Sequence, residues 1–534
     1  MQGRVLIFGL DGATFTVIED LVKRGVMPYF GEVLQRGARG DLMSIVPPLT
    51  PPAWTTLVTG RSPGNHGIFN FLQYDSPTSN FIRMVSTRQV STETIWQIVG
   101  RYGKRAGSLN FVVHNPGYKV DGYVIPGWIG WRWVKVQSHP NDLIKRLQAG
   151  LPSLDLKELA MDFNEEEKAI AGTFHEDYLP WIDLHIRREQ QWFGILKHQF
   201  INDPTALTGV VFDGVDKLQH LCWPFLDPRI EPKDKSESFL RVRNRCWDYF
   251  RMIDGFLKQM VELAGSETHT FVVSDHGFTG SHEILYVNRF FEKMGWLTWN
   301  DSCPIIEDES HELGAVRPFT QDAFNRERSL VYAPFASNNG IVIPIKGVRG
   351  PNGIDPEKYE GFRREVIDAL LTKCVDEQGK PVITRVWTRD ECFPGPKRDI
   401  ACDLTVALRD FGNFSVLRSN SIVKSRGTIL GCHHPAGVFL ALGPGVQAGA
   451  RIDPITLLDI APTALYAMGL PVPEDFEGRL AKQAFRADYL ASHPLQFGPP
   501  TVSMTGDAPS VAPIKEEEPD EQVMMRLKAL GYIE

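Results

Sequence analysis

The sequence predicts an α/β fold in which a mainly parallel sheet lies between layers of helices. Two observations support this fold class. Short apolar runs of the buried-strand type recur along the chain, and stretches with helical apolar spacing separate them. The first run, Val5–Leu10, stops abruptly at Asp11-Gly12, as a strand does where it enters a turn. Because parallel strands need crossover connections, this alternation favours helices on both faces of the sheet.

The expected elements can be justified in chain order. RVLIFGL, residues 4–10, reads as the first strand, and a helix through Glu19, Leu21 and Val22 follows it. ARGDLMSIV, residues 38–46, reads as another strand. Later apolar runs of the same kind are Leu207–Phe212, His269–Ser274, Asp403–Leu408 and Gly437–Leu442.

We expect one catalytic domain, residues 1–498, with two insertions that form a cap. Residues from about 126 to 200 hold five of the twelve tryptophans and many charges, which favours a mainly helical insertion. Residues from about 283 to 400 mix Pro, Gly and short β-like runs, which indicates a second insertion. Residues 499–534 combine an acidic run with the helical pattern VMMRLKALGY, so we expect an acidic linker and a C-terminal helix.

The composition excludes several classes of protein. The 534 residues include 57 Lys and Arg against 65 Asp and Glu, a net charge of −8, so the chain has no general attraction for a nucleic-acid polymer or an anionic lipid. No window approaches the run of about 18 apolar residues that a membrane span needs. Seven scattered cysteines without a CxxC pair are typical of reduced thiols, and we expect a cytoplasmic protein. The composition gives no indication of the oligomeric state.

Metal-ligand residue types gather where the expected strands end. Reactive groups in α/β sheets collect beyond the carboxyl ends of the strands, and Asp with His is a ligand set that zinc and manganese prefer. Each residue alone is more often a helix cap or a packed core residue, so the joint pattern carries the prediction. Asp216 and His220 lie four residues apart and share a face if their segment is helical. The full set is Asp11, Thr50, Asp216, His220, Asp275, His276, His433 and His434.

The motifs together resemble the alkaline phosphatase superfamily and, within it, the type I phosphodiesterase/nucleotide pyrophosphatase family, in particular its bacterial predicted phosphohydrolase/phosphomutase subgroup. The resemblance spans most of the chain and implies an alkaline-phosphatase-like fold. The segments that carry it, in the family's order, are VLIFGLDGA, PPLTPPAWTTLVTGRSPGNHGIFNF, DKLQHLCW, VVSDHGF, GCHHPAGVFLALGPG, DPITLLDIAPTALYAMGLPVPEDFEGR and LKALGYI.

The resemblance implies a site for two divalent metal ions, with zinc as the expected metal and manganese as a compatible one. It assigns Thr50 as the nucleophile, which forms a covalent phospho-threonine that water then hydrolyses. His434 is expected to stand at the pocket edge. The implied ligands are Asp216, His220 and His433 for one metal, and Asp11, Asp275, His276 and the Thr50 oxygen for the other.

The residues around Thr50 reduce the number of superfamily reactions that the site could catalyse. The stretch TPPAW lacks the C/S-x-P-x-R pattern of the sulfatases. Threonine favours the diesterases and phosphonoacetate hydrolases of the superfamily over the relatives that use serine. Ala53 stands where many nucleotide pyrophosphatases have an asparagine that contacts phosphate, which puts nucleotide specificity in doubt. Candidate substrate contacts are Trp54, Asn110, Asn338 and Asn339.

Three hypotheses for function remain at this stage. The favoured one is a two-metal hydrolase of small phosphodiesters or nucleotide pyrophosphates. The second keeps the site but changes the reaction to phosphonate hydrolysis, monoester hydrolysis or phosphomutase chemistry. The third is a catalytically silent binding protein, which the presence of all seven ligand and nucleophile positions disfavours.

Overall fold

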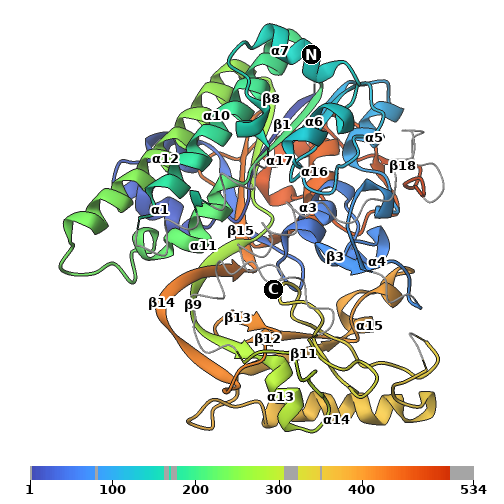
Figure 1. Ribbon diagram of the computed structural model, residues 1–534. Helices are drawn as coiled ribbons and strands as arrows, with labels where there is room; N and C mark the ends of the chain where they lie inside the picture. The colour runs from blue at the N-terminus through green and yellow to red at the C-terminus, as the bar shows by residue number, and fades with distance from the viewer. Residues whose placement is uncertain are drawn as a thin grey trace. The chain divides into compact units, whose positions relative to one another are not determined.

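A computed structural model describes residues 3–78, 82–160, 168–169, 177–305, 323–348 and 351–504 (Figure 1). The acidic run and the C-terminal helix expected in 499–534 lie outside the described residues. Within the described residues the chain divides into two compact units. Unit 1 contains residues 3–62, 86–278 and 433–504, and unit 2 contains residues 63–85 and 279–432.

Unit 1 is built on an eight-stranded sheet with the strand order β16-β2-β15-β8-β1-β7-β5-β6. The central strand β1 carries Val5, Leu6, Ile7 and Phe8, all fully buried, as expected for a strand covered on both faces. Every neighbouring pair is parallel except the two pairs that β15 makes. The strands are β1 (Arg4–Leu10), β2 (Ala38–Met43), β5 (Ala106–Leu109), β6 (Gly122–Ile125), β7 (Leu207–Phe212), β8 (Thr268–Val273), β15 (Ala436–Leu442) and β16 (Ile455–Thr456).

The antiparallel strand β15 determines which residues meet at the edge of the sheet. It pairs Ala436 with Met43 of β2 and Phe439 with Val273 of β8. Its beginning therefore lies beside the ends of β2 and β8. Residues that precede β15 consequently share one edge with residues that follow β1, β7 and β8.

Helices cover both faces of this sheet, which confirms the predicted α/β class (Figure 1). On one side lie α1 (Phe15–Lys23), α10 (Leu179–Asn202) and α12 (Glu237–Ala264), and on the other lie α3 (Thr50–Thr59), α5 (Ile95–Arg101) and α16 (Ile460–Ala467). Helix α2 (Pro28–Arg36) packs on β2, β15 and α12, and α11 (Gly214–Leu226) packs on α10 and α12. The amphipathic α12 turns Val242, Tyr249 and Leu257 inward.

The described residues between 126 and 200 contain helices but no strand. The helices are α6 (Trp131–Gln137), α7 (Leu143–Gly150), α8 (Leu156–Leu159) and α10, and α10 packs against β7. Residues 499–504 continue along unit 1, where the Thr501 N–H donates to Asp475 and the Val502 N–H donates to Glu93. The smaller elements of unit 1 are α17 (Ala487–Ser492), β17 (Val472–Pro473) and β18 (Phe497–Gly498).

Unit 2 contains a strand that the sequence pattern assigned to the wrong sheet. The apolar run 403–408 forms β12 (Leu404–Leu408), which pairs antiparallel with β10 (Gly340–Ile341) and β11 (Ile383–Thr388) rather than joining the parallel sheet. An apolar run reports burial of a strand, but it carries no information about its partners. The other elements of unit 2 are β3 (Leu72–Tyr74), β4 (Ile82–Met84), β9 (Gly277–Tyr286), β13 (Asn413–Ser415), β14 (Val423–His434), α4 (Pro63–His66), α13 (Val287–Lys293), α14 (Tyr359–Thr372) and α15 (Arg389–Cys392).

The chain passes between the units along β9 and β14. Phe278, the second residue of β9, ends a segment of unit 1, and the chain re-enters unit 1 at His433 near the end of β14. Among the helices that the structure describes, none combines the length and the apolar character that crossing a membrane requires.

Candidate active site

The seven expected ligand and nucleophile residues all belong to unit 1 and follow from its topology. Asp11 comes directly after β1, and Asp275 and His276 come just after β8. His433 lies three residues before β15, whose antiparallel direction brings it to the same edge. Asp216 and His220 lie on α11 after β7, and Thr50 is the first residue of α3.

The first cluster combines Asp216, His220 and His433. Asp216 Oδ1 lies 3.3 Å from His220 Nε2 and 3.2 Å from His433 Nε2. The two histidine Nε2 atoms are 3.1 Å apart. The helical spacing of Asp216 and His220 therefore places both side chains on one face of α11, as the sequence predicted. Three donor atoms this close together suit one divalent cation.

The second cluster combines Asp11, Asp275, His276 and Thr50, all fully buried. His276 Nε2 lies 3.6 Å from Asp11 Oδ1 and 3.4 Å from Asp275 Oδ2. The Thr50 hydroxyl Oγ1 lies 3.3 Å from the same His276 nitrogen. The ligand atoms of Asp11, Asp275 and His276 lie within 4.8 Å of one another, a spacing that could hold a metal ion.

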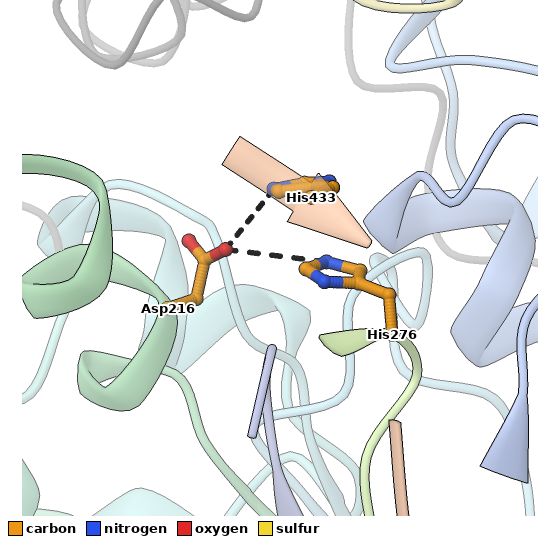
Figure 2. A group of neighbouring side chains, drawn as sticks. All are labelled: Asp216, His276 and His433. Atoms are coloured by element: carbon orange, nitrogen blue, oxygen red, sulfur yellow. Dashed lines mark ion pairs between the residues drawn. The ribbon is translucent and has the colours of Figure 1, made fainter. Parts of the chain in front are cut away.

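The two clusters adjoin each other. Asp216 Oδ1 is 3.9 Å from His276 Nε2, and the rings of His276 and His433 stack with their centroids 3.7 Å apart. Figure 2 shows one carboxylate oxygen of Asp216 directed toward both of these histidines. Adjacent ligand clusters of this kind are the arrangement that two-metal phosphoryl-transfer sites use.

The hydrogen bonds of the histidines show which ring nitrogens are available to a cation. His276 Nδ1 lies 3.1 Å from the Gly277 carbonyl oxygen, and His433 Nδ1 lies 2.8 Å from that of Pro48. A carbonyl oxygen only accepts, so each Nδ1–H donates and each Nε2 faces the carboxylates. Because burial lowers the pKa of His276, its neutral ring turns the electron pair of Nε2 toward them. Metal-bound histidines characteristically donate their second N–H in this way.

The buried carboxylates supply a test of whether the residues fit a metal. Asp11 Oδ1 and Asp275 Oδ2 are buried and accept no hydrogen bond from any described residue. Both oxygens face the Nε2 electron pair of His276. Electron-rich atoms that face one another in a buried site need a cation between them, because burial of unpaired polar atoms is costly. The donor set therefore fits divalent metal ions.

The electrostatics of the site agree with this reading. Burial, with repulsion from Asp275 and Asp216, raises the pKa of Asp11 well above its usual range. Burial also raises the pKa of Asp275 to about 8 and lowers the pKa of His276 well below its usual value. Burial alone would raise the pKa of Asp216 too, but Lys217 and His220 hold it well below the ordinary value.

Thr50 lies at the N-terminus of α3, where the helix dipole favours negative charge on a nearby oxygen. The preceding Leu49 is extended, and Pro51 and Pro52 occupy the first turn, where prolines fit because the first N–H groups of a helix have no partner within it. Because the Nε2 of His276 is an acceptor, the Thr50 hydroxyl donates to it. The start of α3 therefore holds this hydroxyl next to His276.

The four candidate substrate contacts have different surroundings. Trp54 is buried, and its indole N–H donates to Asp11 Oδ2 at 3.3 Å, so it orients a candidate metal ligand. Asn110 follows β5, and its side-chain amide donates to the Val211 carbonyl at 2.8 Å. Asn338 and Asn339 belong to unit 2, where their amides donate to Cys402 Sγ and to the Val406 carbonyl.

Other residues that hold the site were missed from the sequence. Lys217 is fully buried, and its Nζ lies 3.0 Å from Asp216 Oδ2. The Gly12 N–H donates to Asp275 Oδ1 at 3.1 Å, and the Gln219 amide donates to the Gly12 carbonyl at 2.8 Å. The Asp-Gly pair at the end of β1 was a usable signal for Gly12. A single lysine between two ligands gave no signal, because such a residue is usually solvated.

The mainly parallel sheet and the buried Asp–His clusters at its edge define a metal-dependent α/β hydrolase of the alkaline phosphatase type. A comparison with known protein families matches residues 5–428 to type I phosphodiesterase / nucleotide pyrophosphatase. The match covers most of the chain, and the chain belongs to this family. It is therefore a metal-dependent phosphoester hydrolase. No curated protein matches the sequence.

Solved structures share this fold at low sequence identity. Phosphonoacetate hydrolase from Sinorhizobium meliloti 1021, in complex with phosphonoacetate, has a TM-score of 0.50 and 17% identity over 88% of this chain and 96% of its own. Murine ectonucleotide pyrophosphatase / phosphodiesterase 5 has a TM-score of 0.48 and 16% identity over 88% of this chain and 95% of its own. An inactive form of the murine protein, in complex with AMP, has a TM-score of 0.49.

Proposed function

We propose that this protein hydrolyses a small phosphodiester or nucleotide pyrophosphate, with Thr50 as the nucleophile and two divalent metal ions as cofactors. The observation that carries the proposal is the position of the Thr50 hydroxyl. It lies at the start of α3, 3.3 Å from Nε2 of His276, a candidate ligand of the second cluster. A hydroxyl in this position needs a neighbouring charge to become a nucleophile at neutral pH, and the clusters are built to hold that charge.

The ligand assignment follows the two clusters. The first metal would be held by Asp216, His220 and His433, and the second by Asp11, Asp275 and His276 together with the Thr50 oxygen. When bound, divalent cations lower the pKa of a hydroxyl or a water and stabilise the charge of a phosphoryl group. Mixed Asp and His ligands favour zinc, and manganese is compatible with them.

The reaction then has two displacements. The Thr50 oxygen attacks phosphorus, the bond from phosphorus to the leaving oxygen breaks, and Thr50 carries the phosphoryl group. Water next attacks the same phosphorus, and the bond to the Thr50 oxygen breaks. The dipole of α3 stabilises negative charge on that oxygen. Two inversions give net retention of configuration at phosphorus.

Phosphonate hydrolysis is the second candidate, because a phosphonoacetate hydrolase shares the fold with a TM-score of 0.50. Ala53 is consistent with either substrate class. It is buried in α3 and supplies no side-chain amide for a nucleotide phosphate. Monoester hydrolysis and phosphomutase chemistry would use the same residues and differ in the leaving group.

We also propose a cytoplasmic location. None of the seven cysteines, all of which lie in the described residues, forms a disulfide, and Cys222, Cys246, Cys374, Cys402 and Cys432 are buried. Cysteines that form no disulfide are typical of proteins kept in a reducing compartment, which supports the proposal. Fractionation of cells that express the tagged chain tests it.

The test compares matched aryl phosphate diester and monoester substrates, and phosphonoacetate, with protein loaded with zinc or with manganese. We expect the diester to be preferred and its hydrolysis to fall by more than about 10³-fold in Thr50→Ala. Thr55→Ala is the matched control, because the Thr55 hydroxyl only donates to the Pro51 carbonyl within the same helix. Undiminished turnover in Thr50→Ala would refute the assignment of Thr50 as the nucleophile. Preference for the monoester or for phosphonoacetate would refute the diester proposal and select the corresponding alternative.

A further inference from the structure

The two carboxylate oxygens of Asp216 have different neighbours. Oδ1 faces His220 Nε2 and His433 Nε2 at 3.3 and 3.2 Å. Oδ2 lies 3.0 Å from the ammonium of Lys217, whose side chain is 0% exposed. One oxygen is thus directed at the ligand cluster, and the other is paired with a cation that belongs to the protein.

The contact between Lys217 and Asp216 depends on an enclosure. Adjacent residues on a helix do not face each other, so this ion pair does not follow from helix geometry. The ring of Trp128 lies 3.7 Å from the Lys217 ammonium and supplies a cation–π contact. The Trp181 indole N–H donates to the Lys217 carbonyl at 3.2 Å. Two tryptophans from the tryptophan-rich stretch therefore fix both the side chain and the backbone of Lys217.

We propose that Lys217 is a positioning residue that reserves Oδ2 of Asp216 for itself and leaves Oδ1 to bind the metal. The inference rests on the two-metal site proposed above. A carboxylate that offers both oxygens takes two positions on a metal ion, whereas one that offers a single oxygen leaves a position for a substrate oxygen. Lys217 also offsets one of the three carboxylate charges of the site, those of Asp11, Asp216 and Asp275.

The test measures metal binding as well as turnover. Metal-free wild type, Lys217→Met and Lys217→Arg are titrated with zinc by calorimetry, and the visible spectrum of the cobalt-substituted proteins reports the number of ligands around the metal. We expect Lys217→Met to bind one of its two metals about 10–100-fold more weakly, with an altered cobalt spectrum, and Lys217→Arg to recover part of the loss. Lys197→Met is the matched control, because Lys197 bonds to Gln259 on the exposed surface.

A double-variant cycle separates positioning from general damage to the fold. If Lys217 acts through Asp216, then Lys217→Met causes no further loss of metal affinity in a protein that already carries Asp216→Asn. If Lys217→Met alone does not fold, the comparison of Asp216→Asn with the double variant still tests the inference. The double variant removes both members of the ion pair and so leaves no unpaired buried charge.

If the wild-type protein binds two metals, either of two results would overturn the inference about Lys217 and leave the two-metal proposal intact. One is wild-type affinity and an unchanged cobalt spectrum in Lys217→Met. The other is an equal loss from Lys217→Met with and without Asp216→Asn. Wild-type protein that binds fewer than two metals overturns the two-metal proposal and this inference with it.

Discussion

Replacing Gly277 with alanine tests whether the candidate metal ligands at the edge of the sheet depend on a close approach of two backbone segments. A Cβ at position 277 would lie 1.9 Å from the Ala436 carbonyl oxygen, where ordinary contact begins at 3.4 Å. The shortfall is 3.4 − 1.9 = 1.5 Å. The obstacle is backbone rather than a side chain that can rotate, so the start of β9 or of β15 must move. Overpacking of this kind costs about 1–3 kcal/mol of stability.

A movement of the start of β9 or of β15 would also move candidate metal ligands. His276 precedes Gly277, and His433 lies three residues before Ala436, so separation of these segments pulls apart the stacked rings of the two histidines. A displacement of about 1 Å at a reacting centre can cost about 10²-fold in rate. We therefore expect Gly277→Ala to lower the melting temperature, weaken zinc binding and reduce kcat/KM for the best substrate by about that factor.

The assay is thermal melting of the metal-free and zinc-loaded protein, together with zinc calorimetry and kinetics. Gly255→Ala is the control, because position 255 lies inside α12 with open space around an added Cβ. That change should stabilise the protein by up to about 1 kcal/mol and leave zinc binding alone. Wild-type melting and zinc affinity in Gly277→Ala would refute the close-approach argument.

Three further predictions concern the ligands. Trp54→Phe removes the donor to Asp11 Oδ2 and should weaken zinc binding by about 10–100-fold in calorimetry, and unchanged affinity would contradict the role of the indole. Elemental analysis should show that His433→Ala loses one of the two metals and that His434→Ala keeps both. The Nδ1 of His434 accepts from the Ala436 N–H, and the ring is not part of either cluster. Because burial raises the pKa of Asp275 to about 8 in the metal-free protein, its carboxyl is protonated below that pH and must lose the proton to a metal. Zinc affinity should therefore rise as the pH increases toward about 8, with proton release that calorimetry in two buffers measures, and affinity independent of pH would refute this assignment. For the same reason thermal melting should show the metal-free fold losing stability as the pH rises from about 3.8, where an unfolded aspartate titrates, to about 8, with no further loss above that pH.

The sequence predicted the sheet, and it predicted that most of the candidate ligands lie together because parallel strands end at a common edge. Asp11, Asp216 and Asp275 each follow a buried apolar run, so one topological rule brought them together. His433 needed the family resemblance, because it precedes a strand that runs in the opposite direction to its neighbours. The direction of a strand depends on its partners in the sheet, and no local pattern of residues encodes it.

Other features of the site depend on contacts between distant residues. Trp54 had no pattern to distinguish a pocket wall from a buried residue that bonds to Asp11. Lys217 is buried with its ammonium against the ring of Trp128, and Trp181 bonds to its backbone carbonyl. The structural reason for Gly277 is the close approach of the Ala436 carbonyl. Each of these depends on tertiary neighbours far away in the sequence.

The place of β15 between β2 and β8 has a consequence for the synthesis of the protein. Without β15, the strands β2 and β16 have no neighbour that connects them to the rest of the sheet. His433 and this strand are made long after Asp11, Thr50 and Asp275 have left the ribosome. A growing chain, or one terminated before residue 433, therefore holds most of the proposed catalytic residues but cannot complete the first candidate metal cluster. Hydrolytic activity should appear only once the sheet has closed around β15, so unfinished chains would not attack the phosphoesters around them.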